Sequence, residues 1–250
     1  MSEPLDPDNA IEVRSVSKHY RLGELQGLAA SLGLTRHRPP PFRALDDVSF
    51  EVRRGECFGI LGGNGSGKST VLQIISGITV PTSGEALVRG NVLPFLQVGA
   101  GFHPELTGRE NIILYGTVMG IDRDVIMASI DKVAAFAEIE SHIDTPNKRY
   151  SDGMQARLSF AIAIIFPAHI YLFDEVLAVV DDAFRSRCVA EIAGLVAAGR
   201  TVIFVSHDLD QVRRVCTRAA WLQDGRLMAV GEVDDVARRY STGQAVEAHA

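Results

Sequence analysis

A glycine-rich segment carrying a lysine and hydroxyl side chains is the part of this sequence best suited to chemistry. It reads GGNGSGKST and fits the phosphate-loop pattern G-x-x-x-x-G-K-[ST]. Glycines let backbone N–H groups fold around phosphate oxygens, and the helix start that follows adds partial positive charge. Lys68 would reach the β- and γ-phosphates of a nucleoside triphosphate, and the Ser69 hydroxyl would bind Mg²⁺. The residues expected at the nucleotide are Gly62, Gly63, Asn64, Gly65, Ser66, Gly67, Lys68, Ser69 and Thr70.

Two carboxylates, Asp174 and Glu175, follow the apolar run 170–173, which is typical of a buried parallel strand. In phosphate-loop enzymes an aspartate at such a strand end holds Mg²⁺. A carboxylate beside it can polarise an attacking water. Acids that merely cap a strand end are the alternative, and the phosphate loop upstream favours the catalytic interpretation.

One histidine, His207, follows a second buried strand at 201–205. In a parallel sheet the strand ends open on the same edge, and ligands bind there. We therefore favour contact between His207 and the γ-phosphate over a purely structural role.

The elements that must position these residues alternate between strands and helices, which predicts an α/β core. A capping box, Thr107 with Glu110, starts a helical stretch that runs to about Asp144. The expected strands are 11–16, 48–52, 57–61, 170–173 and 201–205, with hairpins at 85–97 around Gly90-Asn91 and at 219–230 around Asp224-Gly225. The other expected helices are 69–76, 151–166, 181–197, 208–216 and 233–240.

The domain organisation expected from this order is a core of residues 1–106 and 167–240, interrupted by a helical subdomain at 107–166. Residues 21–43 look inserted within the core, and 241–250 are expected to form a flexible tail.

Composition limits the classes of function. The 250 residues carry a formal net charge of −6, which argues against a nucleic-acid surface. Three widely spaced cysteines fit neither a disulfide framework nor a zinc site, so a reducing compartment is expected. The acidic N-terminus lacks the order of a signal peptide, and the longest apolar run, 160–173, is too short to cross a bilayer. A membrane function would need a partner that supplies the spanning segments.

The sequence Tyr150-Ser151-Asp152-Gly153-Met154, taken with the motifs above, resembles the ATP-binding cassette (ABC) ATPases. The resemblance implies a P-loop NTPase fold: an ABC-type nucleotide-binding domain with a RecA-like core and an inserted helical subdomain. In that family, residues matching Ser151 and Gly153 begin the signature helix and face the γ-phosphate of ATP held by a second copy. Three positions depart from the usual Leu-Ser-Gly-Gly-Gln, and Asp152 brings a negative charge close to phosphate.

The same resemblance assigns four further residues. Tyr20 would stack on adenine, although a packing role for this tyrosine remains an alternative. Gln97 would meet Mg²⁺ and sense the membrane partner. Met154 and Asp181 would lie at the nucleotide site with Ser151 and Gly153.

Several segments are similar to one subgroup, the ATPases that export bacterial cell-surface polysaccharides. They are the signature above, GAGFHPELTGREN at 99–111, EVLAV at 175–179 and the long insertion after Tyr20. The insertion carries a leucine stripe, 22–32, which either packs on the core or borders the path of the glycan.

The resemblance implies an ATP- and Mg²⁺-dependent ATPase that exports a lipid-linked O-antigen, teichoic acid or galactan. Its expected partners are a second copy of itself, a membrane permease with about six spans and the glycan, with no nucleic acid, at the cytoplasmic face of the membrane. Three alternatives stay open: another cargo such as a lipid or drug, a non-transport ABC ATPase, and a nucleotide-binding scaffold without turnover.

Overall fold

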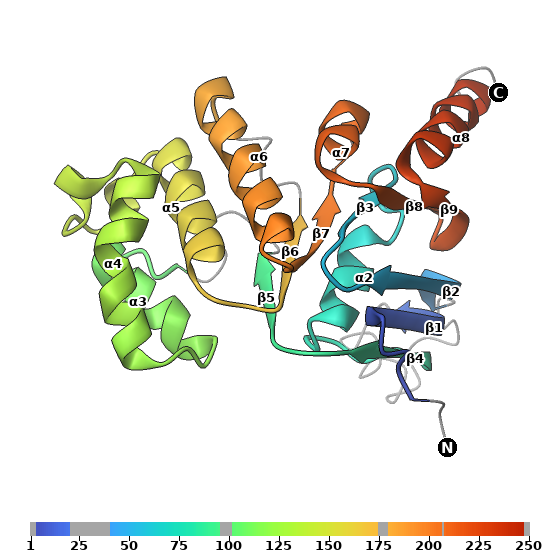
Figure 1. The fold of residues 1–250 in the computed structure, drawn as a ribbon, viewed down its shortest axis with the longest axis horizontal. Coiled ribbons are helices and arrows are strands. Elements are labelled where there is room, and N and C mark those ends of the chain that lie inside the picture. Colours follow the sequence, from blue (N-terminus) through green and yellow to red (C-terminus); the bar gives the residue numbers. More distant parts are fainter. Residues whose placement is uncertain (1–3, 21–40, 96–101, 175–179, 207, 248–250) are drawn as a thin grey trace, which may run out of the picture.

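The computed structural model describes residues 4–20, 41–95, 102–174, 180–206 and 208–247. Within them the chain forms two β-sheets and a set of helices (Figure 1). The six-stranded sheet contains, in spatial order, β5 (Val92–Phe95), β6 (Ile170–Asp174), β7 (Thr201–Val205), β3 (Cys57–Leu61), β8 (Arg218–Gln223) and β9 (Arg226–Glu232). Neighbours from β5 to β8 pair in parallel, and β9 pairs antiparallel with β8.

A second, antiparallel sheet has the order β2-β1-β4. Its strands are β1 (Asn9–Tyr20), β2 (Phe42–Arg53) and β4 (Ser83–Val88). Between the two sheets lies α2 (Lys68–Ile75), whose apolar residues pack with those of β1, β2 and β3 in one core (Figure 1). The phosphate-loop helix is therefore held by both sheets.

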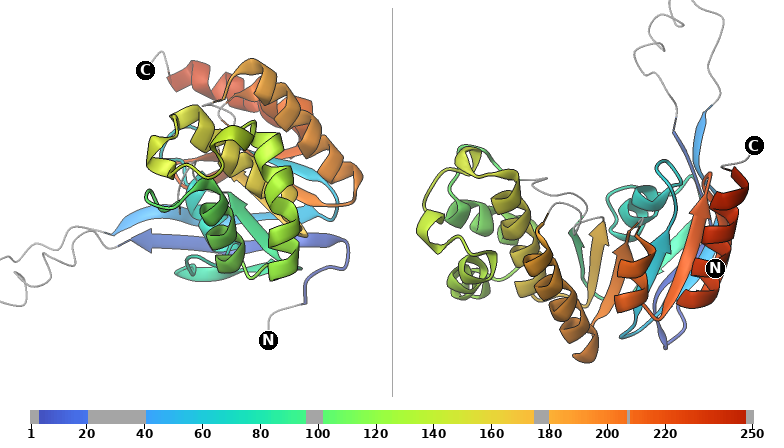
Figure 2. Two further views of the ribbon diagram at one scale, coloured as in Figure 1. Left: turned by 90° about the vertical axis from the view of Figure 1, so that its left-hand side faces the viewer. Right: turned by 90° about the horizontal axis from the view of Figure 1, so that it is seen from above.

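The other helices cover the opposite face of the six-stranded sheet or stand beside it. They are α3 (Gly108–Val118), α4 (Arg123–Ala137), α5 (Asp152–Ile165), α6 (Asp182–Ala197), α7 (Leu209–Val215) and α8 (Val233–Glu247), with short 3-10 helices at Glu140–His142 and Asn147–Arg149. The group α3, α4 and α5 lies to one side of the sheet in Figure 1 and in the right-hand view of Figure 2. It occupies the range 107–166, although the division into domains remains a prediction. Among the helices that the structure describes, none combines the length and apolar character needed to cross a membrane.

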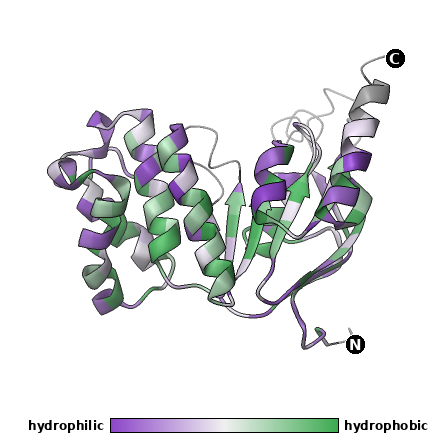
Figure 3. Ribbon diagram, turned by 45° about the horizontal axis from the view of Figure 1, so that its top comes forward, coloured by the Kyte–Doolittle hydropathy of each residue, from purple (hydrophilic) through white to green (hydrophobic). Residues whose placement is uncertain are grey.

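Alternation along the central strands explains why both faces of the six-stranded sheet are buried. In β6, Tyr171 and Phe173 join the core formed with α3 to α6, whereas Ile170 and Leu172 join the core around α2. The central strands are correspondingly hydrophobic in Figure 3. Continuous apolar runs are what a doubly covered parallel sheet requires, so the prediction of buried strands at 170–173 and 201–205 is confirmed.

The turn between β8 and β9 confirms the predicted hairpin at Asp224-Gly225. Both residues have positive φ, 47° and 75°, as a tight two-residue turn needs. The capping box predicted at Thr107 and the N-cap predicted at Ser151 are also present.

The hairpin predicted at 85–97 is wrong. β4 pairs with β1 in the three-stranded sheet, whereas β5 pairs with β6 in the other sheet. The Gly90-Asn91 turn is real, because Gly90 has φ 106°, but it carries the chain from one sheet to the next. At the C-terminus, α8 continues to Glu247, so the predicted helix end at Tyr240 and the predicted tail start are both too early. Phe42 and Arg43, predicted within the insertion, already belong to β2.

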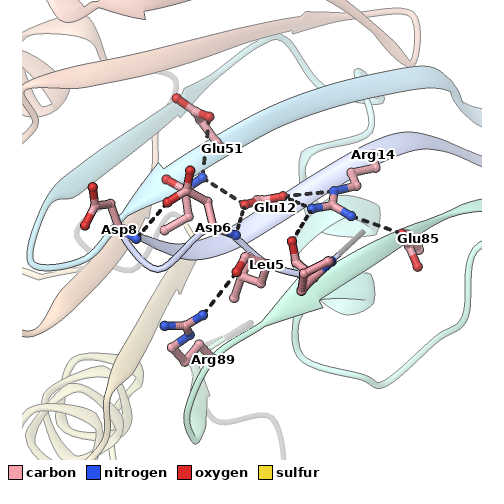
Figure 4. A network of polar contacts seen from close by, with 10 residues as sticks. Leu5, Asp6, Asp8, Glu12, Arg14, Glu51, Glu85 and Arg89 are labelled. Atoms are coloured by element: carbon pink, nitrogen blue, oxygen red, sulfur yellow. Dashed lines mark hydrogen bonds and ion pairs between the residues drawn. The ribbon is translucent and has the colours of Figure 1, made fainter. Parts of the chain in front are cut away.

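A buried polar network fixes the N-terminal segment to the three-stranded sheet (Figure 4). Glu12 is 9% exposed and accepts hydrogen bonds from Asn9 Nδ2 at 2.9 Å, the Asp6 N–H at 2.8 Å and Arg14 Nε at 2.9 Å. The hydrogen bond from Asn9, followed by that from Asp6, lowers the pKa of Glu12 below its usual value of 4.5. The carboxylate therefore stabilises the folded state when it is charged.

Replacing Glu12 with alanine is expected to lower the free energy of unfolding by about 2 kcal/mol at neutral pH, because the buried amide of Asn9 and two partly buried donors lose a charged acceptor. Urea unfolding measures this difference. Since the folded pKa is depressed, the stabilisation is complete above 4.5 and should disappear as pH falls through the lower folded value. Glu85→Ala is the control: Glu85 meets Arg14 at 3.5 Å at the surface and should cost less than about 1 kcal/mol. Equal losses in both variants would contradict the prediction.

Candidate functional site

The glycine-rich loop joins β3 to α2, and its shape depends on glycine at two positions. A Cβ on Gly62 would lie 2.4 Å from the carbonyl oxygen of Leu222, and one on Gly67 would lie 2.7 Å from that of Ala44. Both residues also have positive φ, 155° and 103°. A side chain at either position would collide with backbone of the neighbouring strands, so the loop follows this path only with glycine.

The β8–β9 turn supports the loop from behind. The Gly225 N–H donates to the Ser66 carbonyl at 3.1 Å, and the Gly225 carbonyl accepts from the Asp46 N–H at 2.8 Å. The hairpin predicted from Asp224-Gly225 thus has a positioning role that the sequence does not reveal.

Lys68 begins α2 and turns its side chain back into the loop. Its ammonium group donates to the carbonyl oxygens of Gly62 at 2.8 Å and Gly63 at 2.9 Å, and the residue is 7% exposed. The N-cap of this helix, Gly67, has no side chain that could accept a hydrogen bond from the first turn. A cation and the N-terminal end of a helix therefore lie at one loop, which is the arrangement that binds phosphate.

Ser69 and Asp174 meet although they are far apart in sequence. The Ser69 hydroxyl donates to Asp174 Oδ2 at 2.8 Å. The sheet causes this contact, since Val205 of β7 pairs with both Ile60 of β3 and Asp174 of β6. The carboxyl ends of these strands therefore reach the same edge. A hydroxyl and a carboxylate supply the hard oxygen atoms that Mg²⁺ prefers, so these residues fit that ion.

Glu175, His207 and Gln97, all expected at the site, lie outside the described residues. Their described neighbours have defined positions. Asp174 ends β6, and Ser206, which is buried, accepts a hydrogen bond from the Asp208 N–H at 3.0 Å. Both neighbours lie at the edge of the sheet where the phosphate loop begins.

Ser151 is the N-cap of α5, where its hydroxyl accepts from the Met154 N–H at 3.2 Å. Ser151 and Asp152 are exposed. A Cβ on Gly153 would come no closer than 3.9 Å to the surrounding chain, so the fold itself does not demand glycine there. The N-terminal end of α5 and the start of α2 also lie apart in Figures 1 and 2. One copy of the chain does not bring Ser151 to its own phosphate loop.

Tyr20 and Asp181, two further expected site residues, are engaged within the chain. Tyr20 ends β1, pairs with Phe42 and has the Lys18 ammonium 5.1 Å from its ring centroid. Asp181 is the N-cap of α6, accepts from the Phe184 N–H at 2.9 Å and forms an ion pair with Arg157.

Sequence reasoning gave no role to Asn111, which the structure buries completely beside the site-bearing helices. Its side chain donates to the carbonyls of His103, Leu106 and Thr107 at 2.9–3.1 Å and accepts from the His103 N–H at 2.7 Å. The residue thus ties the start of α3 to the segment before it. An asparagine inside the first turns of a helix, where its propensity is poor, was the available signal.

Together, a parallel sheet with a phosphate loop after β3 and an aspartate at the end of β6 define a P-loop NTPase. Comparison with known proteins narrows the class. The sequence profile of the ABC transporter family matches residues 45–178. The chain therefore belongs to the ABC transporter family.

Individual relatives agree with this assignment. The O-antigen export system ATP-binding protein RfbB of Klebsiella pneumoniae is 39% identical over 204 residues, which cover 82% of this chain and 83% of the relative. The teichoic acids export ATP-binding protein TagH of Levilactobacillus brevis is 39% identical over 238 residues, 94% of this chain and 66% of the relative. Among solved structures, a dimeric post-hydrolysis state of the ATP-binding cassette MJ0796 bound to ADP and Pi superposes with a TM-score of 0.75 at 24% identity, covering 89% of this chain and 98% of that one. The fold predicted from the sequence is confirmed.

Proposed function

We propose that this chain is the ATP-hydrolysing subunit of an ABC transporter that exports a lipid-linked cell-surface polysaccharide. The observation that carries the ATPase assignment is the contact between Ser69 and Asp174 beside the loop that encloses Lys68. The cargo rests on relatives named for O-antigen and teichoic acid export, which are similar to this chain over most of its length.

ATP binding begins at the phosphate loop. The ammonium of Lys68 exchanges the carbonyls of Gly62 and Gly63 for β- and γ-phosphate oxygens, which carry full negative charge and accept stronger hydrogen bonds. The first turn of α2, whose N-cap is a glycine, adds its N–H groups. Tyr20 stacks on adenine.

Mg²⁺, when bound, neutralises charge on the β- and γ-phosphates. Ser69 and Asp174, whose side-chain oxygens lie within hydrogen-bonding distance of each other, would hold the ion. Gln97 would add a side-chain oxygen and sense the membrane partner. Glu175 orients the attacking water and His207 holds the γ-phosphate, both at the strand ends beside Asp174 and Ser206.

Two copies of the chain enclose the nucleotide. Ser151, Gly153 and Met154 of one copy face the γ-phosphate held by Lys68 of the other, because the α5 N-terminus is exposed and lies apart from the loop of its own copy. The open space at Gly153 leaves room for a phosphate to approach the backbone. Closure is therefore linked to ATP binding, and hydrolysis reopens the pair.

A membrane permease with about six spans converts this cycle into polymer movement, and the chain works at the cytoplasmic face of the membrane. Deleting the gene from its source bacterium tests the proposal. We expect the lipid-linked polysaccharide to accumulate inside the cell and to be lost from the surface. The wild-type gene should restore export and Lys68→Ala should not. Unchanged surface polysaccharide would overturn this cargo and leave a lipid, drug or non-transport role.

Replacing Asp174 with asparagine is expected to remove the effect of magnesium on ATP binding. The wild type should bind ATP more tightly with Mg²⁺, and the variant should lose at least about tenfold of that gain, because a neutral amide is a weaker ligand. Titration with and without Mg²⁺ measures this. Asp144→Asn is the control, since Asp144 pairs with Arg109 at the surface. A variant that still responds fully to Mg²⁺ would contradict the metal assignment.

A further inference from the structure

Two arginines and two acids form a cluster where α4, α5 and α6 meet. Arg157 of α5 forms ion pairs with Glu138, at the C-terminal end of α4, and with Asp181, the N-cap of α6. Arg187 of α6 forms an ion pair with the other oxygen of Glu138. Of the two arginines, Arg157 joins α5 to the N-terminal end of α6 in the described contacts, whereas Arg187 joins α6 to the end of α4.

Aromatic rings fix the geometry of the cluster. The guanidinium of Arg157 lies 5.1 Å from the ring centroid of Phe184, which is fully buried in the first turn of α6. Arg187 lies over Phe136 at 4.8 Å and over Phe184 at 5.6 Å. A guanidinium held against a buried ring has few alternative positions, so its hydrogen bonds define an orientation as well as a contact.

The charge state supports this contact. The backbone N–H of Phe184, and after it Arg157, lowers the pKa of Asp181 below its usual value. The carboxylate is therefore ionised at neutral pH, and it serves at the same time as a helix cap and as an ion-pair acceptor.

The two elements joined by Arg157 belong to different parts of the nucleotide site. Along α5, Arg157 follows Ser151, which caps that helix. Asp181 follows seven residues after Asp174, which accepts a hydrogen bond from the Ser69 hydroxyl. Arg157 therefore joins the helix that Ser151 caps to the residue that caps α6.

We propose that Arg157 is a positioning residue that makes the N-terminal part of α5 and the start of α6 move as one body. This inference rests on the proposed function and deepens it. When ATP draws Ser151 of one copy onto the nucleotide of another, Arg157 carries the displacement to Asp181 and aligns the segment that bears Glu175. Asp181 then acts through Arg157 within its own copy rather than by touching the nucleotide.

Steady-state ATP hydrolysis by the full chain tests the proposal. Arg157→Met keeps an aliphatic stem against Phe184 and removes the charge. We expect kcat to fall about ten- to a hundredfold, because catalytic groups lose alignment. The affinity of the single copy for ATP should not change, because Lys68 and its loop are untouched. The cooperativity of hydrolysis with ATP concentration should also decrease.

Arg187→Met is the matched control. It removes the same group from the same cluster, yet its contacts run to Glu138, Phe136 and Phe184 rather than to Asp181. We expect its kcat to stay near that of the wild type. Equal losses in both arginine variants would mean that the cluster only stabilises the fold, and would overturn the proposal.

Asp181→Asn provides a second line of evidence that does not depend on Arg157 variants folding. Asparagine caps helices as well as aspartate, so the variant keeps α6 and loses only the charge. Its kcat should fall as much as in Arg157→Met, and the double variant should fall no further, because both changes break one contact. Multiplied losses would overturn the proposal. If the wild-type chain itself hydrolyses no ATP, the proposed function fails instead.

Discussion

Replacing Glu175 with glutamine is expected to slow ATP hydrolysis by about 10²–10⁴-fold, the usual scale for one positioned proton acceptor. Glutamine keeps the shape of the side chain and cannot take a proton from the attacking water. ATP binding should persist, because it depends on Lys68 and the glycine-rich loop. Phosphate release under saturating ATP measures the first effect, and nucleotide titration measures the second.

The control for this variant is Glu191→Gln, an identical change at an exposed position of α6. It should leave phosphate release unaltered. Near-normal phosphate release by Glu175→Gln would show that another group activates the water.

Replacing Lys68 with alanine is expected to weaken ATP binding by roughly a hundredfold, since hydrogen bonds to charged groups contribute about 1.5–3 kcal/mol each. The Lys68 ammonium donates to the carbonyl oxygens of Gly62 and Gly63, so a cation is already present at the loop where the phosphates would bind. Equilibrium titration with a fluorescent ATP analogue measures the change.

Lys148→Ala is the matched change, because Lys148 is half-exposed and pairs with Glu105 away from the loop. Circular dichroism must show that Lys68→Ala remains folded, since Lys68 is buried and its ammonium donates to two carbonyls of the loop. A folded variant with the wild-type dissociation constant would refute the phosphate-loop assignment.

The sequence predicted those strands and turns that are determined by a few consecutive residues. The short apolar runs at 170–173 and 201–205 are typical of buried strands, and Asp224-Gly225 can adopt the positive φ that a tight turn needs. The contact between Ser69 and Asp174 was also implied, because parallel strands end at a common edge.

Non-local pairing is where sequence reasoning failed. The Gly90-Asn91 sequence indicates a turn but not whether the chain returns to the same sheet or crosses to another. The sheet is determined by distant partners, since β4 pairs with β1 and β5 pairs with β6. The ion pair between Arg157 and Asp181 was missed for the same reason. The sequence around Arg157 and around Asp181 does not indicate that either side chain pairs with a residue of another helix.

The order of strands in the sheet has a consequence for how such proteins diversify. β5 and β6 are adjacent at the edge of the six-stranded sheet, and the whole group α3, α4 and α5 is inserted between them. Both attachment points therefore lie on one border, away from β3 and β8. Natural selection can therefore change that lobe outside the N-terminal end of α5 without altering the strands and the loop that position Lys68, Ser69 and Asp174.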